Sequence, residues 1–516
     1  MLRKFFKIIF SRMSLVALAI IAQIILSIGL PYILNYFHPE IFSRLYIQID
    51  LIINIIAVIM VLCLINSNMI AEGKIAWVII FAVFPILGIV IYRMFVWYKA
   101  PKRHRKFYIQ VKNRVAEINK KNAVENSKLR EKLGKYYGQF EYIYKTSNLK
   151  TYENTDVQYL HLGEVFYEEL LKELELAKSY IFMEYFIIER GQMWNSILKV
   201  LERKVKEGVE VRIMYDDLGT IHKLPNNYPK RLRKMFIKAV KFNSFVPIMS
   251  ALHNNRDHRK ITVIDGKVGF VSGANLADEY INKVQPYGYW KDTAVKLKGE
   301  AVASLLMMFL QLYNVQTQRL EDFKPYLKDV KPVKASGFVC PFGDGPKYFY
   351  EDYIAENVYL NMINQAEKYI WITTPYLITD SKIMNALCAA AKRGVDVRII
   401  TPHKADKKTI FIMTRSSYKP LKKAGVKIYE YEKGFIHSKQ FLCDDELAIV
   451  GTINLDYRSL LHHYECGVLM YKTSCLKDIK RDFEHLFTVS INMKDFKQHP
   501  ITRLIASFLK VFTPML

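Results

Sequence analysis

An internal repeat constrains the fold of this chain more than any other feature of its sequence. Residues 258–275 (HRKITVIDGKVGFVSGAN) align position by position with residues 437–454 (HSKQFLCDDELAIVGTIN). Ahead of each copy, a β-rich run leads through an amphipathic helix to a second strand rich in Val and Ile. These β-rich runs are residues 177–186 and 207–217 in the first half, and residues 366–376 and 393–403 in the second. The alternation is typical of layered α/β folds, so the duplication predicts two similar α/β domains related by a pseudo-twofold axis.

Both copies contain the pattern His-x-Lys-x4-Asp, followed at a fixed distance by an asparagine. The residues are His258, Lys260, Asp265 and Asn275 in the first half, and His437, Lys439, Asp444 and Asn454 in the second. We expect the histidine, the lysine and the aspartate of both copies to be catalytic. Side chains two positions apart in a strand point to the same face, so each His and Lys should point together. A site between two such halves would receive one copy of the motif from each.

Two histidines and two lysines suit displacement at a phosphodiester. One imidazole can attack phosphorus and form a phosphohistidine, while the other donates a proton to the leaving alkoxide and later takes one from the incoming hydroxyl. The lysines, Asn275 and Asn454 can donate hydrogen bonds to the nonbridging oxygens. The sequence contains no HExxH, paired CxxC or Walker phosphate loop, so we expect neither a metal nor another cofactor.

Charge and apolar residues are unevenly distributed. The chain has 75 Lys and Arg against 49 Asp and Glu, a formal net charge of +26, which favours a polyanionic partner such as nucleic acid or an anionic membrane. Three apolar runs, residues 13–37, 51–71 and 75–98, are each long enough to cross a bilayer. They predict a membrane-spanning helical region over residues 1–98, with a kink or a shallow entry at Pro85.

Basic residues flank this region on both sides, at residues 3–12 and 99–106. Because basic flanks remain cytoplasmic, three crossings would conflict with one of the two flanks. Either the amino end lies outside, or one run does not cross. We expect a multi-pass protein of the cell membrane, with its catalytic part on the cytoplasmic side.

The remaining chain divides into three parts. Residues 99–140 are predicted to form a basic juxtamembrane linker. A first domain follows over residues 141–325 and a second over residues 326–516, with the proline-containing stretch 320–347 as the connector. Apolar residues of the carboxyl tail recur with helical spacing over residues 501–512, which predicts an interfacial amphipathic helix or a helix packed on the core.

The doubled motif resembles the phospholipase D superfamily over residues 140–516. With its apolar amino end, the chain is similar to the bacterial cardiolipin synthases of that superfamily, which is supported by TTPYLI (373–378), GFIH (434–437) and GTINLDYRS (451–459). The resemblance implies two α/β sandwich domains of the phospholipase D type. It also implies reversible transfer of a phosphatidyl group from one phosphatidylglycerol to another, which gives cardiolipin and glycerol.

The resemblance further implies an acidic residue that orients each histidine. By position these residues are Asp292 and Glu465, and we expect Asp292 to hold His258 and Glu465 to hold His437 within the same half. The superfamily more often uses the amino-terminal copy as nucleophile, which implies that His258 attacks and that His437 begins protonated. One departure is His463, where many relatives have Asn.

Three other functions fit parts of the sequence. A membrane-bound phospholipase D hydrolase would use the same residues with water as acceptor. A membrane-tethered nuclease would suit the basic charge, but the three apolar runs count against it. A catalytically inactive scaffold is disfavoured because both motifs are complete. We therefore expect phosphatidylglycerol and the lipid bilayer as partners, and no nucleic acid. The sequence leaves the oligomeric state open.

Overall fold

The computed structural model describes residues 39–96, 102–120, 123–244 and 255–515, together with Tyr32 and Tyr36. The described residues form two compact units. The smaller unit contains residues 39–96 and 507–515, and the larger unit contains residues 102–244 and 255–506. Both copies of the repeated motif belong to the larger unit.

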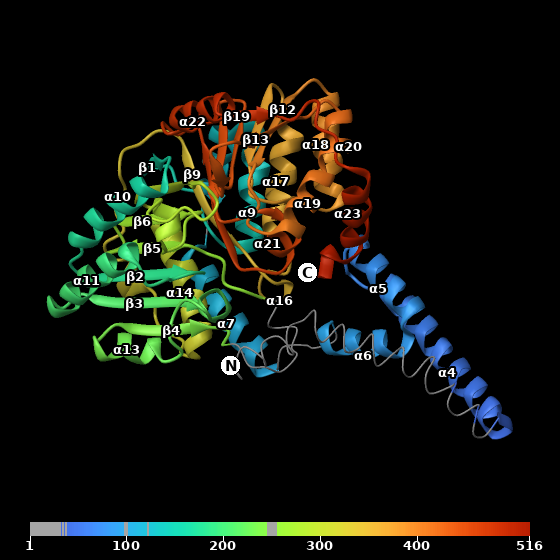
Figure 1. Cartoon of the computed structure of the whole chain (residues 1–516). Coiled ribbons are helices and arrows are strands. Elements are labelled where there is room, and N and C mark those ends of the chain that lie inside the picture. Colours follow the sequence, from blue (N-terminus) through green and yellow to red (C-terminus); the bar gives the residue numbers. More distant parts are fainter. Residues whose placement is uncertain are drawn as a thin grey trace. The chain divides into compact units, whose positions relative to one another are not determined.

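The first half of the larger unit contains a seven-stranded mixed sheet (Figure 1). Its strands are β1 (Thr155–Leu160), β2 (Tyr180–Tyr185), β3 (Glu210–Asp216), β4 (Lys238–Phe242), β5 (Ile261–Ile264), β6 (Val268–Ser272) and β8 (Ala294–Gly299). They lie in the order β1-β8-β6-β5-β2-β3-β4. Strands β2, β3 and β4 are parallel, and the other pairs are antiparallel. The β-rich runs predicted at 177–186 and 207–217 are confirmed as β2 and β3.

The second half repeats this sheet with one additional strand. Its strands are β9 (Phe338–Asp344), β10 (Tyr369–Thr373), β12 (Asp396–Pro402), β13 (Lys427–Tyr431), β15 (Gln440–Cys443), β16 (Leu447–Gly451), β18 (Glu465–Tyr471) and β19 (Ser490–Asn492). The order β19-β13-β12-β10-β15-β16-β18-β9 matches the first sheet strand for strand, with β19 added beyond β13. The predicted duplication of the α/β fold is therefore confirmed.

Helices cover the sheets and connect their strands. In the first half these helices are α7 (Lys102–Ile118), α8 (Ala123–Leu133), α9 (Tyr137–Ser147), α10 (Gly163–Glu175), α11 (Gln192–Lys206), α12 (Asp217–Thr220), α13 (Tyr228–Lys234) and α14 (Val302–Thr317). In the second half they are α15 (Lys324–Leu327), α16 (Lys347–Tyr350), α17 (Ile354–Gln365), α18 (Ser381–Lys392), α19 (Lys408–Ser416), α20 (Tyr418–Lys423), α21 (Tyr457–Leu461), α22 (Leu476–Thr488) and α23 (Pro500–Phe512).

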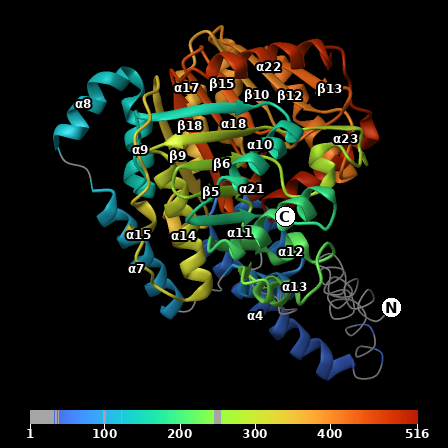
Figure 2. The same ribbon diagram turned by 90° about the vertical axis from the view of Figure 1, so that its left-hand side faces the viewer.

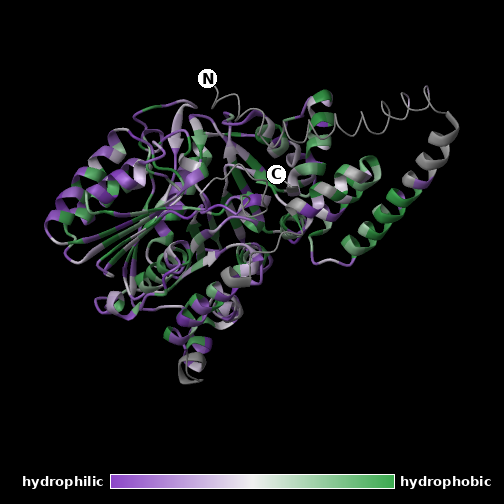
Figure 3. Cartoon of the chain, turned by 90° about the horizontal axis from the view of Figure 1, so that it is seen from below, coloured by the Kyte–Doolittle hydropathy of each residue, from purple (hydrophilic) through white to green (hydrophobic). Residues whose placement is uncertain are grey.

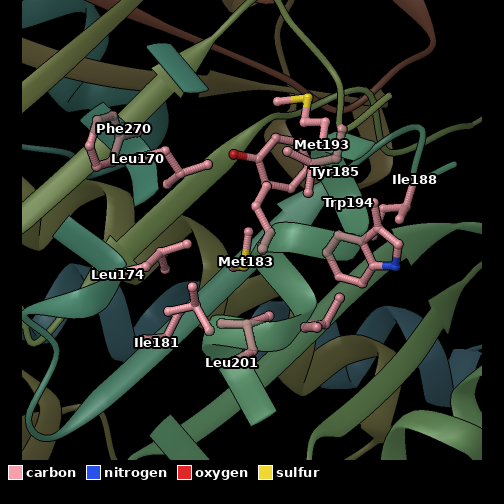
Figure 4. Close-up of a cluster of buried hydrophobic side chains, with 14 of the residues drawn as sticks. Leu170, Leu174, Ile181, Met183, Tyr185, Ile188, Met193, Trp194, Leu201 and Phe270 are labelled. Carbon is pink, nitrogen blue, oxygen red and sulfur yellow. The ribbon is translucent and has the colours of Figure 1, made fainter. Parts of the chain in front are cut away.

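The first sheet is covered on both faces. Alternate residues of β2, Ile181 and Met183, pack with α10 and α11 in a buried cluster that also contains Trp194 (Figure 4). On the opposite face, Phe182 stacks on Phe309 of α14 with ring centroids 5.0 Å apart. Because side chains alternate along a strand, a strand covered on both faces is apolar throughout.

Helix α14 is buried along nearly its whole length, from Val302 to Val315. It appears in yellow beside α7 in Figure 2. A helix that is apolar on all sides must be packed against other elements on all sides. Helix α7 packs against α14, and its residues Val111 and Val115 are fully buried. Residues 102–118 thus pack as part of the larger unit, which differs from the linker expected over 99–140.

Two short strands connect the halves. Strand β7 (Tyr289–Lys291) of the first half pairs in parallel with β14 (Gly434–Ile436) of the second. A single bridge links Asp257 to Tyr464 in the same way. Backbone of each half therefore lies beside the motif of the other half. Within the second half, β11 (Leu377–Ile378) pairs with β17 (Leu455–Asp456).

The smaller unit contains α4 (Pro39–Ile65), α5 (Ala71–Val83) and α6 (Pro85–Phe95). The helical conformation is interrupted at Phe84, between α5 and α6, which confirms the kink predicted at Pro85. Proline causes such an interruption because it removes a helical hydrogen bond and clashes with the preceding turn. The third apolar run therefore forms two short helices in place of one continuous helix. The two helices have 13 and 11 residues. They measure about 20 Å and 17 Å at 1.5 Å per residue, and neither equals the thickness of a bilayer core.

Within the described part of the chain, no helix has both the length and the apolar character that a membrane crossing needs. The first apolar run, residues 13–37, lies outside the described residues except for Tyr32 and Tyr36. Many apolar side chains of α4 are exposed, and Figure 3 colours much of this helix as hydrophobic. The exposed residues are Leu51, Ile52, Ile55, Ile56, Val58, Ile59, Leu62 and Ile65.

The predicted amphipathic helix of the carboxyl tail is present as α23. Its apolar residues Ile501, Leu504, Ile505 and Phe508 are exposed, and Leu504 exposes 72% of its surface. Exposed apolar side chains are expected of an interfacial helix, and this role of α23 stays a prediction.

Candidate active site

The two motifs occupy equivalent positions in their sheets. His258 and Lys260 come directly before β5, and His437 and Lys439 come directly before β15. The ladder continues into each motif, because the amide of Ser272 donates to the carbonyl of Lys260 at 3.2 Å, with the matching bond in the second half. All four side chains are buried, and each histidine exposes 7% of its surface.

The halves bring these motifs together by exchanging backbone contacts. The amide of His437 donates to the carbonyl of Lys291 at 2.7 Å, and the amide of His258 donates to the carbonyl of Tyr464 at 2.8 Å. Lys291 and Tyr464 each directly precede the acidic residue of their own half. Each acid is thereby placed beside the histidine of the opposite half.

The resulting acid–histidine pairs are crossed. Nδ1 of His258 lies 2.9 Å from Oε1 of Glu465, and Nδ1 of His437 lies 2.7 Å from Oδ2 of Asp292. The expectation that each acid holds the histidine of its own half is wrong. With Nδ1 facing a carboxyl group, Nε2 is the ring nitrogen left for chemistry.

Both histidines favour the neutral form. Burial, followed by the charge of Lys260, holds the pKa of His258 well below its usual value. Burial and the charge of Lys439 lower the pKa of His437 to about 4. Burial and the charge of Lys439 thus oppose the protonated form expected of His437, whereas a bound phosphodiester anion would favour it.

The two lysines lie against the histidine backbones. Lys260 Nζ donates to the carbonyl of His258 at 2.6 Å, and Lys439 Nζ contacts the carbonyl of His437 and lies 2.7 Å from Nδ1 of that ring. Burial lowers the pKa of Lys260 to about 8 and that of Lys439 to about 7. An anion placed between the motifs would meet both ammonium groups.

The two acids have different surroundings. Burial favours the neutral form of Asp292, but the charges of Lys439 and His437 outweigh it and lower its pKa. Burial raises the pKa of Glu465 well above its usual value, and this carboxyl group accepts a hydrogen bond from the Thr452 hydroxyl. The position equivalent to Thr452 in the first half is Gly273.

Position 273 requires a glycine for a steric reason. A Cβ at this position would lie 2.0 Å from Oδ1 of Asp292, closer than any real contact. Any other residue there would force Asp292 away from His437. The glycine can be read from the sequence, but only the tertiary structure shows that Asp292 lies against it.

The motif aspartates do not act at this site. Asp265 accepts hydrogen bonds from the amides of Lys178, Ser179 and Tyr180 at 2.7–2.9 Å, and Asp444 accepts the equivalent three from residues 367–369. Each aspartate lies seven positions beyond its histidine, at the far end of the strand, about 23 Å away at 3.3 Å per residue. This corrects the expected catalytic role, because both aspartates anchor the loop before the central strand.

The two asparagines differ in their contacts within the fold. Asn275 Oδ1 accepts from the amide of Ile187 at 2.9 Å, and its Nδ2 donates to the hydroxyl of Tyr280 at 2.6 Å. Asn454 is buried, and its Oδ1 has no hydrogen-bond partner. The structure thus gives Asn275 a role in holding its loop, and its binding to phosphate stays a prediction.

Aromatic rings around the histidines were not predicted as site residues. Phe186 lies 5.1 Å from the ring of His258, while Trp290 and Tyr280 lie 5.2 Å and 5.6 Å from that of His437, measured between ring centroids. The usable signal for Phe186 is its place at the carboxyl end of a parallel strand, where α/β sheets form their sites. The rings give both histidines apolar neighbours.

His463 lies beside His258, with ring centroids 5.6 Å apart. Its Nδ1 is 3.9 Å from Oε1 of Glu465, and neither of its ring nitrogens has a hydrogen-bond partner. Among the described residues, His258, His463 and Glu465 form the group whose ligand atoms could hold a metal ion, since they lie within 4.8 Å of one another.

Comparison with known families agrees with this geometry. The family model described as "Cardiolipin synthase, PLD-like domain" matches residues 170–303 and 359–487, one segment in each half. This chain belongs to the cardiolipin synthase family with phospholipase D-like domains. The two matched segments contain both His-Lys motifs and both acids of the crossed pairs.

Curated members of the family are similar over most of the chain. A cardiolipin synthase of Alkalihalophilus pseudofirmus is 36% identical over 448 residues, which cover 85% of this chain and 88% of the relative. One of Halalkalibacterium halodurans is 32% identical over 506 residues, which cover 96% and 98%. An uncharacterized protein of Streptococcus mutans is 44% identical over 463 residues, which cover 88% and 99%.

A solved structure shares the fold. Phosphatidylserine synthase of Haemophilus influenzae matches with a TM-score of 0.56 and 15% identity, over 73% of this chain and 97% of that one. This similarity agrees with the two-sheet architecture of the cardiolipin synthase family member described here.

Proposed function

We propose that this protein is a cardiolipin synthase that transfers a phosphatidyl group from one phosphatidylglycerol to another, through a phosphohistidine, and releases glycerol. The crossed acid–histidine pairs carry this proposal. The support comes from two imidazoles, each hydrogen-bonded to an acid of the other half, and from the two buried lysines of the same motifs. No metal or other cofactor takes part, because the cationic side chains bind the phosphate oxygens themselves.

In the first half-reaction, Nε2 of His258 attacks phosphorus. A P–N bond forms as the P–O bond to the glycerol headgroup breaks. The bound phosphodiester anion raises the proton affinity of His437, which then donates a proton from Nε2 to the leaving glycerol oxygen. Lys260 and Lys439 hold the nonbridging oxygens throughout.

In the second half-reaction, the terminal hydroxyl of another phosphatidylglycerol replaces the departed glycerol. His437 takes its proton while the oxygen attacks phosphorus and the P–N bond breaks. Cardiolipin leaves and His258 is restored. The steps are reversible because one phosphodiester is exchanged for another. With the acids crossed, Glu465 orients the nucleophile His258 and Asp292 orients the acid–base His437.

The alternative function is hydrolysis, in which water replaces the second lipid and the product is phosphatidic acid. The same residues would act in both reactions. Aromatic rings beside both histidines favour synthesis, because they restrict the access of water. Incubation of the purified protein with labelled phosphatidylglycerol separates the two. Equal amounts of cardiolipin and glycerol support synthesis, and phosphatidic acid without cardiolipin would contradict it.

We further infer that the enzyme works at a lipid surface, with the larger unit on the cytoplasmic side. Exposed apolar side chains of α4 and α23 support this proposal, as does the basic segment over residues 99–106. Phosphatidylglycerol is itself a bilayer lipid, so a buried site near the surface could receive headgroups without extracting whole lipids.

A further inference from the structure

The imidazole of His463 is a buried polar group that the mechanism above does not use. It exposes 9% of its surface, and neither ring nitrogen has a hydrogen-bond partner. Buried polar groups in native proteins are nearly always satisfied, so an unpaired imidazole beside a reactive histidine points to a ligand.

Two other ligand atoms face this ring. Oε1 of Glu465 lies 3.9 Å from Nδ1 of His463 and 2.9 Å from Nδ1 of His258. In a tetrahedral site with bonds of about 2.0–2.2 Å, ligand atoms lie about 3.3 Å apart. These two separations bracket this value, and all three ligand atoms lie within 4.8 Å of one another, so side-chain rotations would bring them to the spacing of a metal site.

The opposite half does not offer the same site. Two residues before Asp292, where the second half has His463, the chain has Trp290, whose ring packs 5.2 Å from His437. An indole nitrogen donates a hydrogen bond but has no lone pair for a metal. Of the two acid–histidine pairs, the pair of His258 and Glu465 alone has a third ligand residue two positions before its acid.

We propose that His258, His463 and Glu465 bind a divalent transition-metal ion such as Zn²⁺, and that this ion reversibly inhibits phosphatidyl transfer. Two imidazole nitrogens and one carboxylate oxygen suit Zn²⁺, whereas Mg²⁺ and Ca²⁺ take mainly oxygen ligands. The metal would bind Nδ1 of His258 in place of the proton between His258 and Glu465, and that proton would move to Nε2, so Nε2 would have no lone pair with which to attack phosphorus.

The surrounding charge makes this binding reversible. Arg458, Arg256 and Lys260 place positive charge near His463, which opposes a cation, and the negative charge of Glu465 in its metal-bound form would offset part of this repulsion. We therefore expect a chelator to remove the ion completely. Metal binding itself does not depend on the proposed function, whereas the inhibitory role rests on it.

Binding is tested with Co²⁺ as a spectroscopic probe for Zn²⁺. The full-length protein, freed of metals by a chelator and then of the chelator, is titrated while the visible absorption of tetrahedral Co²⁺ is recorded. We expect an absorption band that Zn²⁺ abolishes. The substitution His463→Asn, and independently His463→Gln, should weaken binding at least about tenfold, since even outer-shell partners contribute this much.

The matched control is His403→Asn. Nδ1 of His403 lies 2.8 Å from Oε2 of the buried Glu430, so this substitution also removes a histidine paired with a glutamate, but not one of the three proposed ligands. It should leave the Co²⁺ band unchanged. Absence of a band in the unmodified protein, or a band of full intensity in both His463 variants, would overturn the proposed site.

Inhibition is tested by measuring cardiolipin formation with Zn²⁺, with Mg²⁺ and with chelator. Zn²⁺ should reduce the activity of the unmodified enzyme about tenfold or more at saturation, and Mg²⁺ should not. Zn²⁺ should reduce the activity of each His463 variant by a smaller factor than it reduces the activity of the control His403→Asn. Equal inhibition of all proteins by Zn²⁺ would overturn the inhibitory role. If the unmodified protein with chelator makes no cardiolipin, the proposed function fails, while the Co²⁺ titration still decides the metal site.

Discussion

At each motif histidine, the orienting acid comes from the other half of the chain. His258 faces Glu465 and His437 faces Asp292, through hydrogen bonds of 2.9 Å and 2.7 Å. The crossing assigns the acids to different steps. If His258 attacks phosphorus, Glu465 supports the nucleophile and Asp292 supports the general acid. Pairing within each half would assign them the other way round.

A substrate with a nitrophenolate leaving group separates these assignments, because such a group departs without a proton. In single-turnover experiments on a p-nitrophenyl phosphatidyl ester, His437→Ala and Asp292→Asn should retain most of the nitrophenolate burst. His258→Ala should abolish the burst, and Glu465→Gln should slow it about tenfold or more. A burst lost in Asp292→Asn and retained in Glu465→Gln would contradict the crossed assignment.

With phosphatidylglycerol the same variants behave differently. Its glycerol leaving group needs a proton, so His258→Ala and His437→Ala should each lower cardiolipin formation about 10⁴-fold, as expected when a nucleophile or its acid partner is removed. The measurement is chromatography of the lipid products. A variant of either histidine that retains near-normal synthesis would rule out a shared site.

The lysines predict the alkaline side of the pH profile. Lys439, with a pKa of about 7, and Lys260, with a pKa of about 8, lose their positive charge as the pH rises through these values. Because the charged forms bind the phosphodiester, kcat/KM should fall between about pH 7 and pH 9. Lys439→Arg stays charged, so its decline should begin at higher pH, even though its maximum is lower. An unchanged profile would show that Lys439 does not bind the anion.

Among the elements, β7 and β14 are short, but their parallel pairing places first-half backbone beside the second motif, and the bridge between Asp257 and Tyr464 places second-half backbone beside the first motif. Helix α23 has a different role. Its apolar side chains are exposed, and in water each such residue leaves apolar surface unburied. Burial of a large apolar side chain in lipid stabilises binding by about 1.5–3 kcal/mol.

The double substitution Leu504→Ala and Phe508→Ala should therefore weaken binding to phosphatidylglycerol vesicles at least about tenfold in flotation assays. Thr502→Ala on the same helix is the matched control, because it removes no large apolar side chain. The fold should remain intact, since both substituted residues are exposed. Unaltered flotation of the double variant would indicate that α23 does not contact the lipid.

On the scale of the whole molecule, the larger unit contains two copies of one sheet, and neither copy holds a complete site. The histidine of each half needs the acid of the other, and burial of both motifs requires the two halves together. One chain thus supplies a nucleophile, an acid–base group, two lysines and two orienting acids. A single chain should be sufficient for turnover.

Mixing two inactive variants tests this expectation. When His258→Ala and His437→Ala are combined at equal concentration, cardiolipin formation should remain at the level of either variant alone, since a complete site forms within one chain. The control is unmodified enzyme diluted to the same concentration with one variant. Recovery of about a quarter of normal activity would instead indicate that halves are exchanged between two chains.

The duplication, the order of β-rich runs and the four basic residues of the site are all determined by the sequence itself. Strands and helices follow from apolar periodicity over short stretches, so β2, β3, β10 and β12 were predictable. The shared direction of each His-Lys pair was predictable, because side chains at positions i and i+2 of an extended chain point to the same face. The interruption before Pro85 was also predictable, because proline disrupts the helical turn that precedes it.

The tertiary structure alone decided which residues complete the site. Glu465 and His258 are 207 positions apart, and Asp292 and His437 are 145 apart, so no local pattern connects them. The parallel pairing of β7 with β14 and the bridge between Asp257 and Tyr464 decide the crossing. Similarly, Asp265 is part of the sequence motif, but β5 lies between it and His258, so the aspartate lies at the opposite end of the strand from the histidine. Proximity in the chain determines local conformation, but packing between distant segments determines which groups share a proton.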